Sequence, residues 1–269
     1  MATGSSSGKP KCRGVLTHGT CVAYSGVPDR RKHRGPHPQD VQLFGPESLP
    51  RLQTAAADLL WLLSRGYSRE AALTLVGDRY QLRSRQRTAL GRVCCSREER
   101  RSRAQRCISP DSISGKEVVL DGYNVLTTVE AALAGGLILE CFDTTYRDLA
   151  SMHGSFRSVA ETPTAARLMA QTLDSLGAAS VCWLLDRPVS NSGRLKTQLE
   201  RIETKCCWSV ELEEHVDARL ARASTLIATA DSAILDRCGL WLNLARIVVE
   251  KHISQAHVIR PIPGAYETN

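Results

Sequence analysis

The sequence has no long apolar run, and this absence excludes one large class of protein. A helix that spans a membrane needs roughly 20 consecutive apolar residues, and no stretch of the 269 residues reaches that length. Residues 1–10 are polar and lack the apolar segment of a secretory signal. We therefore expect no membrane partner and a cytoplasmic location.

The sequence also has no Cys-x-x-Cys motif, although it contains ten cysteines. The adjacent pairs Cys94–Cys95 and Cys206–Cys207 do not fit a secreted disulfide framework, so we expect reduced thiols. Cys12, His18 and Cys21 could be imagined as zinc ligands, but their spacing fits no known zinc finger. A zinc site is therefore the weaker interpretation of these three residues.

Charge is unevenly distributed along the chain. Residues 1–110 contain 20 Lys and Arg against 8 Asp and Glu, a balance of +12, whereas residues 111–269 contain 15 against 20, a balance of −5. The basic front part suggests a polyanionic partner, most simply nucleic acid. The acidic back part suggests a site that needs carboxylates.

Composition divides the chain into three segments. Residues 1–46 are rich in Gly, Ser, Pro, Lys and Arg, which predicts a flexible basic arm because this composition cannot bury a core. Its basic run, 29–34, could contact phosphates or could simply be solvated. Residues 47–110 predict a basic helical domain, and residues 111–269 predict an α/β domain.

Apolar residues at helical spacing predict three short helices in the front part. The first begins near Ser48 and ends before Gly66, which suits the left-handed position after a helix. The second covers 69–76 and ends at Gly77, and the third, 83–94, is rich in arginine. This set resembles a helix-turn-helix unit that could contact phosphates. A helical cap packed on the second domain is an equal alternative.

From residue 111 onward, strand signals alternate with helical ones. Strands are expected at 117–120, 137–142, 179–185, 207–212, 225–229 and 240–244, and helices at 125–134, 162–176, 192–205, 216–223 and 232–237. Alternation of this kind is typical of a mostly parallel sheet with helices on both faces. The sequence therefore predicts an α/β fold, preceded by a small all-α domain.

Acidic residues lie at the ends of these strands. Asp121 ends the first strand and Asp186 a later one. Asp217 opens a short helix, and Asp231 follows the next strand. Because ligands gather beyond the carboxyl ends of parallel strands, we expect these four carboxylates to meet there. Like charges so close together repel unless a cation lies among them, and hard oxygen ligands favour Mg²⁺ or Mn²⁺. The set predicts a metal site suited to phosphodiester cleavage.

Each acid also has a purely structural interpretation. An Asp at a strand end often caps a helix or forms a turn, and Asp231 could simply cap the helix that follows it. The prediction therefore depends on the set and not on any one residue. Glu130, Asp143 and Asp148 could each supply a further ligand.

The loop 186–194 is the second distinctive stretch. It offers short hydrogen-bonding side chains just before a helix start, where exposed N–H groups bind anions. The predicted substrate-binding residues are Ser190, Asn191, Ser192, Arg187 and Arg194. An ordinary capped strand-to-helix turn is the alternative.

Residues 115–250 resemble the PIN-like nucleases, including their NYN branch. The motif 121–124 (Asp-Gly-Tyr-Asn), the sequence 216–220 around Asp217 and the T-x-D motif 229–231 carry the resemblance. It implies a PIN-like three-layer α/β/α sandwich and a ribonuclease site that depends on Mg²⁺ or Mn²⁺. By that match the metal ligands are Asp121, Asp186, Asp217 and Asp231, with Asn124 as an orienting residue beside Asp121.

The chain from about residue 49 onward also resembles an uncharacterised two-part family. The sequences 58–67 and 76–80 resemble its helical part, domain of unknown function 434. The loop 186–193 resembles the paired part, domain of unknown function 5616. This resemblance implies the two-part arrangement and brings no activity with it.

Three functions remain open. The first is a metal-dependent endoribonuclease whose catalytic residues are Asp121, Asn124, Asp186, Asp217 and Asp231. The second is a non-catalytic RNA-binding protein with the same fold. The third is a phosphohydrolase for a small substrate, with the loop 190–193 as its anion-binding site. The sequence does not predict the oligomeric state.

Overall fold

The computed structural model of the chain describes residues 34–150 and 156–262. Most of the predicted arm, with Cys12, His18 and Cys21, lies outside the described residues. Within these ranges no helix combines the length and apolar character that a membrane crossing requires.

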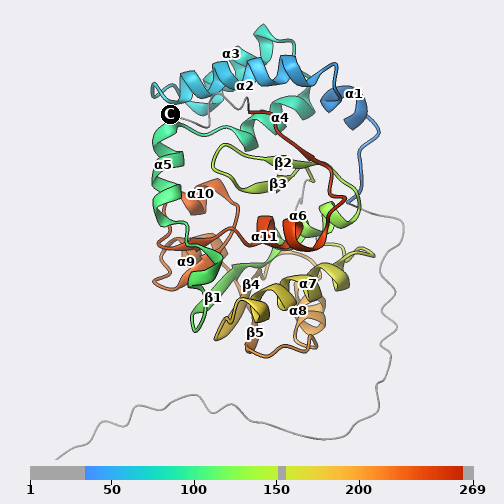
Figure 1. Cartoon of the computed structure of the whole chain (residues 1–269), viewed down its shortest axis with the longest axis vertical. Helices are drawn as coiled ribbons and strands as arrows, with labels where there is room; N and C mark the ends of the chain where they lie inside the picture. The colour runs from blue at the N-terminus through green and yellow to red at the C-terminus, as the bar shows by residue number, and fades with distance from the viewer. Residues whose placement is uncertain (1–33, 151–155, 263–269) are drawn as a thin grey trace, which may run out of the picture.

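The front part is helical. Its helices are α1 (Asp40–Phe44), α2 (Leu49–Leu63), α3 (Arg69–Arg79), α4 (Ser84–Val93) and α5 (Arg97–Arg106). Figure 1 shows α2, α3 and α4 together at one end of the molecule, while α5 runs down one side toward the rest of the chain. The three predicted helices correspond to α2, α3 and α4.

Two details of the front part differ from the prediction. Helix α3 continues past Gly77 to Arg79, and the Arg87 side chain lies where a Cβ on Gly77 would be. This glycine therefore serves close packing and not helix termination. Helix α5 was not predicted, because its sequence has almost no apolar residues; a capping box between Ser96 and Glu99 begins it instead.

The back part alternates strands and helices. Its elements are β1 (Glu117–Asp121), α6 (Gly122–Leu133), β2 (Ile138–Glu140), β3 (Tyr146–Asp148), α7 (Thr162–Ser175), β4 (Ser180–Asp186), α8 (Ser192–Leu199), β5 (Cys207–Glu213), α9 (Val216–Ala221), β6 (Leu226–Ala228), α10 (Ser232–Leu235), β7 (Trp241–Leu242), α11 (Leu244–His252) and β8 (Val258–Ile259). A short 3₁₀ turn, Pro110–Ser112, precedes β1.

Five of these strands form one sheet in the order β5-β4-β1-β6-β7, and every neighbouring pair is parallel. The chain builds outward from β1 through β4 to β5, then returns to the other side of β1 for β6 and β7. The strand order therefore reverses between β1 and β6, and ligands bind at such a switch point in open α/β sheets. The predicted α/β class, with a preceding helical region, is confirmed.

Alternate residues of each strand face opposite sides of this sheet. In β1, Val118 and Leu120 belong to the core that contains residues of α6, α7, α8 and α11, whereas Val119 packs against the core that contains residues of α9 and α10. Side chains in a strand alternate with period two, so both faces of a buried strand must be apolar. The result is a three-layer arrangement of helices, sheet and helices.

The predicted strand 137–142 belongs to a second, smaller sheet. Strand β2 pairs antiparallel with β3 and parallel with β8. Leu137, Leu139 and Phe142 lie in the same core as the apolar residues of α2 and α4. The front helices thus complete their core with this small sheet, which lies directly beneath them in Figure 1.

A buried cluster of charges also joins the front helices to the back part. Asp143 accepts hydrogen bonds from Arg103 of α5 at 2.5 Å and from Arg147 of β3 at 2.7 Å. The side chains of Asp143 and Arg103 are fully buried. We call Arg103, Asp143 and Arg147 the buried triad.

Candidate functional site

The site lies where β1 turns into α6. Gly122 follows the last residue of β1, and a Cβ at this position would lie 2.7 Å from the Leu184 carbonyl oxygen of the neighbouring strand β4. No side chain fits so close to a backbone oxygen, so the turn requires glycine. This close approach keeps Asp121 at the carboxyl end of the central strand.

The Asp121 side chain is buried, with 7 % of the residue exposed, and it does not cap the helix that follows. Its Oδ2 accepts a hydrogen bond of 2.7 Å from the hydroxyl of Thr229, which follows β6. The backbone N–H of Asp231 donates to the same hydroxyl oxygen at 3.0 Å. Thr229 thus links the ends of the two strands on either side of the switch point.

Asn124 holds the same loop from the helix side. Its Oδ1 accepts a hydrogen bond of 2.8 Å from the Ala230 N–H. This bond fixes the segment that carries Thr229 and Asp231 relative to the first turn of α6. Asn124 therefore fixes the loop that carries Asp231, and its orienting role beside Asp121 stays a prediction.

A pocket of about 380 Å³ opens over these residues. The charged side chains that line it are Asp121, Asp148, Asp217, Asp231, Arg92 and Arg147. Arg147 is committed to the loops around it, because it donates to the Ala230 carbonyl at 2.6 Å and to Asp143. Arg92 donates to the Ala150 carbonyl at 3.2 Å and lies 3.7 Å from Asp148. The pocket is thus lined by four carboxylates and by two arginines that are bound to neighbouring backbone carbonyls.

Electrostatics single out Asp121 within this pocket. Burial raises the pKa of its carboxyl to about 7, and the charges of Asp231, Asp217 and Asp186 add to the effect, against the opposing hydrogen bond from Thr229. Burial and the charge of Asp217 also raise the pKa of Asp186. Strongly shifted carboxyls in a pocket are typical of functional sites. All four predicted carboxylates interact at this edge of the sheet.

The four acids are not equivalent. Asp231 caps α10, since its Oδ1 accepts from the N–H groups of Ala233 at 2.8 Å and Ile234 at 3.2 Å. The capping alternative is therefore correct for this residue, although its Oδ2 accepts no hydrogen bond from the described residues. Asp217 is exposed in the first turn of α9, and Asp186 is half-buried at the end of β4, outside the residues that line the pocket.

The donor set suits a hard divalent cation held partly through water. In the described ranges, no three His, Cys, Asp or Glu side chains form a ready-made metal cage. Mg²⁺ does not need one, because it keeps several of its waters and binds through one or two carboxylates together with substrate phosphates. Asp121, with Asp217 or the free oxygen of Asp231, would provide such ligands.

Of the other acids considered, only Asp148 belongs to the pocket. Its carboxylate accepts from the Thr128 hydroxyl at 3.0 Å and from the Ala150 N–H at 2.6 Å. Glu130 is buried against Arg34 and Thr162. Asp143 belongs to the buried triad, so its charge is already neutralised.

The loop 186–194 uses much of its hydrogen-bonding capacity internally. Asn191, with φ of +69°, donates from its side-chain amide to the Phe156 carbonyl at 3.0 Å. Ser192 is buried and donates to the Arg187 carbonyl at 3.3 Å, while Arg187 pairs with Glu214 at 3.2 Å. The side chains of Ser190 and Arg194 are exposed. Phosphate binding by this loop stays a prediction.

Sequence reasoning assigned no role to Tyr123 and Thr229, although both stand in the quoted motifs. Tyr123 lines the pocket and is 4 % exposed, and its hydroxyl has no hydrogen-bond partner among the described residues. Burial, with the charge of Asp186, raises the pKa of this phenol, so it stays protonated as a potential donor. Its ring centroid lies 5.2 Å from that of Phe156.

Both parts of the chain match family models. Residues 110–247 match the family described as "Domain of unknown function (DUF5616)", and residues 51–106 match the family described as "Protein of unknown function (DUF434)". The uncharacterized protein MJ0935 of Methanocaldococcus jannaschii is 29 % identical over 188 residues, which cover 68 % of this chain and 88 % of that protein. No solved structure matches the chain. The predicted two-part arrangement is confirmed.

Proposed function

The chain belongs to the family described as Domain of unknown function (DUF5616), a description that assigns no activity, and we propose from its site that it is a metal-dependent nuclease. The proposed reaction is hydrolysis of phosphodiester bonds within RNA, and the proposed cofactor is Mg²⁺ or Mn²⁺. We further propose that the back part is PIN-like. The parallel sheet, with its acidic residues gathered at the switch point, supports that assignment.

One observation carries the proposal: at the end of the central strand, a buried carboxyl stands among other carboxyls and has no cationic partner among the described residues. Burying a charge is costly unless that charge is paired or coordinates a metal. Within the described part of the chain, the Asp121 carboxylate accepts a hydrogen bond only from the neutral hydroxyl of Thr229, and the nearby charges of Asp231 and Asp217 oppose its ionisation. A divalent cation would relieve both penalties, whereas a purely structural role gives no compensation for them.

The roles of the residues follow from their contacts. A bound Mg²⁺ or Mn²⁺ supplies a Lewis acid for phosphoryl oxygens and lowers the pKa of water. Asp121 would hold the ion with Asp217 or Asp231, and Thr229 keeps the Asp121 carboxylate oriented. Arg92, which also lines the pocket, would attract the substrate phosphate, and the buried Tyr123 hydroxyl is free to donate to a substrate oxygen.

The test compares Asp121→Asn with the wild-type chain on a labelled RNA in Mn²⁺. We expect cleavage to fall at least a hundredfold while folding is retained, because the amide cannot neutralise the cation. Asp111→Asn is the matched control, since Asp111 is exposed in the 3₁₀ turn and does not line the pocket. Unchanged cleavage by Asp121→Asn would exclude the mechanism.

Two other functions give different results in the same assay. A non-catalytic RNA-binding protein would bind the labelled RNA and cut it in no divalent metal; the lack of a preassembled metal cage within the described residues is the observation that favours it. A small-molecule phosphohydrolase would hydrolyse phosphate esters and leave RNA intact.

A further inference from the structure

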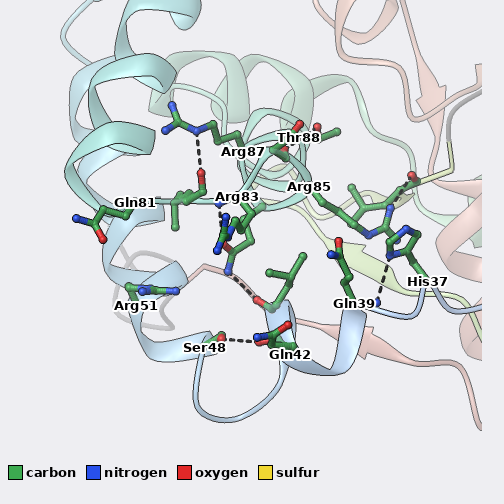
Figure 2. A pocket seen from close by; sticks show the side chains of 15 residues that line it. His37, Gln39, Gln42, Ser48, Arg51, Gln81, Arg83, Arg85, Arg87 and Thr88 are labelled. Atoms are coloured by element: carbon green, nitrogen blue, oxygen red, sulfur yellow. Dashed lines mark hydrogen bonds between the residues drawn. The ribbon is translucent and has the colours of Figure 1, made fainter.

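A second and larger pocket, of about 1130 Å³, lies in the helical front part. Figure 2 shows it between the residues around α1, the start of α2 and the first turns of α4. Four arginines line it: Arg51 from α2, Arg83 just before α4, and Arg85 and Arg87 within α4. No Asp or Glu is among its described lining residues.

Two of these arginines are already paired, and two are not. Arg85 binds the buried carboxylate of Asp40 at 2.6 and 3.0 Å, and Arg87 binds Asp78 at 2.7 Å. Arg51 and Arg83 are exposed, and neither forms an ion pair with a described residue. The paired arginines thus fix the wall of the pocket, while Arg51 and Arg83 keep positive charge available for an anion.

Helix α4 connects this pocket with the acidic one. It presents Ser84, Arg85 and Thr88 to the basic pocket, and Gly91 and Arg92 to the acidic pocket. Positions three or four residues apart share one face of a helix. At 1.5 Å per residue, the seven steps from Ser84 to Gly91, or from Arg85 to Arg92, rise about 10 Å along the helix. The two pockets are therefore neighbours along a single helix face.

The segment 148–150, at the end of β3, also runs from one pocket to the other. Leu149 lines the basic pocket, whereas Asp148 and Ala150 line the acidic one. Arg85 donates to the Leu149 carbonyl at 3.5 Å, and Arg92 donates to the carbonyls of Asp148 and Ala150. Arginines of α4 thus fix the backbone that lies between the two pockets. The spacing of the pockets is set by rigid structure.

The composition of the basic pocket indicates what part of a ligand it recognises. Its described lining is mostly arginine, glutamine, serine, threonine and leucine, with no Phe, Tyr or Trp, and His37 is the one ring in it on which a base could stack. Guanidinium groups bind phosphates through parallel hydrogen bonds. A pocket of this kind favours phosphate groups over bases, and it would bind without sequence preference.

We propose that this basic pocket holds the phosphate backbone of a single-stranded nucleic acid, about 10 Å from the phosphodiester that lies in the acidic pocket. The placement of a phosphodiester in the acidic pocket rests on the proposed nuclease function. The front helices thereby have a role in binding the strand away from the cut.

The test is a binding measurement that does not depend on cleavage. A labelled 12-nucleotide oligouridylate is titrated with the full chain carrying Asp121→Asn, over a series of salt concentrations, and its anisotropy is followed. Adding Arg51→Ala and Arg83→Ala should weaken binding about tenfold, since two phosphate contacts are lost. It should also reduce the slope of log K against log salt by about 1.4, because each contact to a single strand contributes about 0.7.

The matched control removes the same charge elsewhere. Arg97 and Arg101 are exposed residues of α5 that do not line the basic pocket, so Arg97→Ala with Arg101→Ala should leave the salt slope unchanged. An equal loss of affinity in both double variants would overturn the proposal, because it would show only a general charge effect. Binding by Arg51→Ala with Arg83→Ala as tight as that of the parent would also overturn it.

Two further arms separate the strand from other phosphates and from the nuclease proposal. Inorganic pyrophosphate and ATP compete against the oligonucleotide; if either binds as tightly as the 12-mer and depends equally on Arg51 and Arg83, the polymer assignment is wrong. If the arginine variant loses binding while Asp121→Asn alone cleaves RNA normally, the basic pocket is supported and the nuclease mechanism is rejected. If the arginine variant binds normally while Asp121→Asn loses cleavage, the role of the basic pocket is rejected and the nuclease mechanism is supported.

Discussion

The buried triad of Arg103, Asp143 and Arg147 should be the most sensitive link between the front helices and the back part. Asp143 is fully buried, and its other oxygen accepts from the Thr145 hydroxyl at 2.6 Å. We expect Asp143→Asn to reduce the free energy of unfolding by about 3–5 kcal/mol, because breaking a buried ion pair leaves uncompensated charge behind. Here Arg147 would lose its carboxylate partner, and Arg103 would keep only the partly exposed Asp236.

The pH dependence of this contribution has a definite sign. Burial works to raise the pKa of Asp143, but the charges of Arg147 and Arg103 outweigh it and lower the pKa from 3.8 to about 2. A lowered pKa stabilises the folded state above the unfolded value, so the contribution is complete above about pH 4 and is lost as the pH falls through 2. The shift corresponds to about 2 kcal/mol, at roughly 1.4 kcal/mol per pH unit.

The assay is denaturant unfolding of the wild-type chain and of Asp143→Asn between pH 7 and pH 3, with circular dichroism as the signal. Asp236→Asn is the control, because Asp236 binds the same Arg103 at 2.7 Å while its side chain is 36 % exposed. We expect the control to cost less than about 1 kcal/mol. The reasoning is refuted if both variants cost the same, or if the deficit of Asp143→Asn does not shrink as the pH falls.

Three further predictions concern the acidic site. Mn²⁺ at about 100 times its dissociation constant should stabilise the wild-type chain by about 2.7 kcal/mol and so raise its melting temperature. The melting temperature of Asp121→Asn should not change when Mn²⁺ is added. An equal increase in both proteins would show that the ion binds at another place. Gly122→Ala should destabilise the fold by about 1–3 kcal/mol, the usual cost of overpacking, because its Cβ would lie 2.7 Å from the Leu184 carbonyl oxygen; an unchanged unfolding midpoint would contradict the close approach. Thr229→Val should lower RNA cleavage with folding intact, since the 2.7 Å hydrogen bond to Asp121 is lost. Thr229→Ser keeps the hydroxyl and should retain cleavage. Equal cleavage by the Val and Ser variants would show that the hydroxyl does not orient Asp121.

Most elements with an apolar period were predicted, although the amphipathic helix α11 was missed, and elements held by tertiary contacts were not predicted. Helix α5 has few apolar residues, and it is anchored through Arg103 to Asp143 and Asp236. The helix expected at 192–205 ends at Leu199, because the Asp174 carboxylate accepts from the Lys205 and Cys206 N–H groups and holds a turn there. Such partners are remote in sequence and leave no local signal.

The candidate site shows the same division. The motif 121–124 and the acids at strand ends predicted a site at the carboxyl ends of the strands, since parallel strands end at the same edge of a sheet. The burial and the hydrogen bonds of each acidic residue could not be predicted from its place at a strand end. Capping by Asp231, the buried position of Asp121 and the exposure of Asp217 depend on how three elements pack.

The sequence by itself determined the strands of the main sheet and most of the helices beside them, because periodicity and turn residues act over a few neighbouring positions. It did not predict β3, β8 or α11. It also determined that acidic side chains end on one edge of the sheet and that basic charge gathers in the front helices. Only the tertiary structure decided that β2 leaves the main sheet to complete the core of those helices. It likewise brought Arg51 and Arg83 to one pocket beside the acidic site. These features depend on contacts between residues far apart along the chain, and such contacts form only when whole elements pack together.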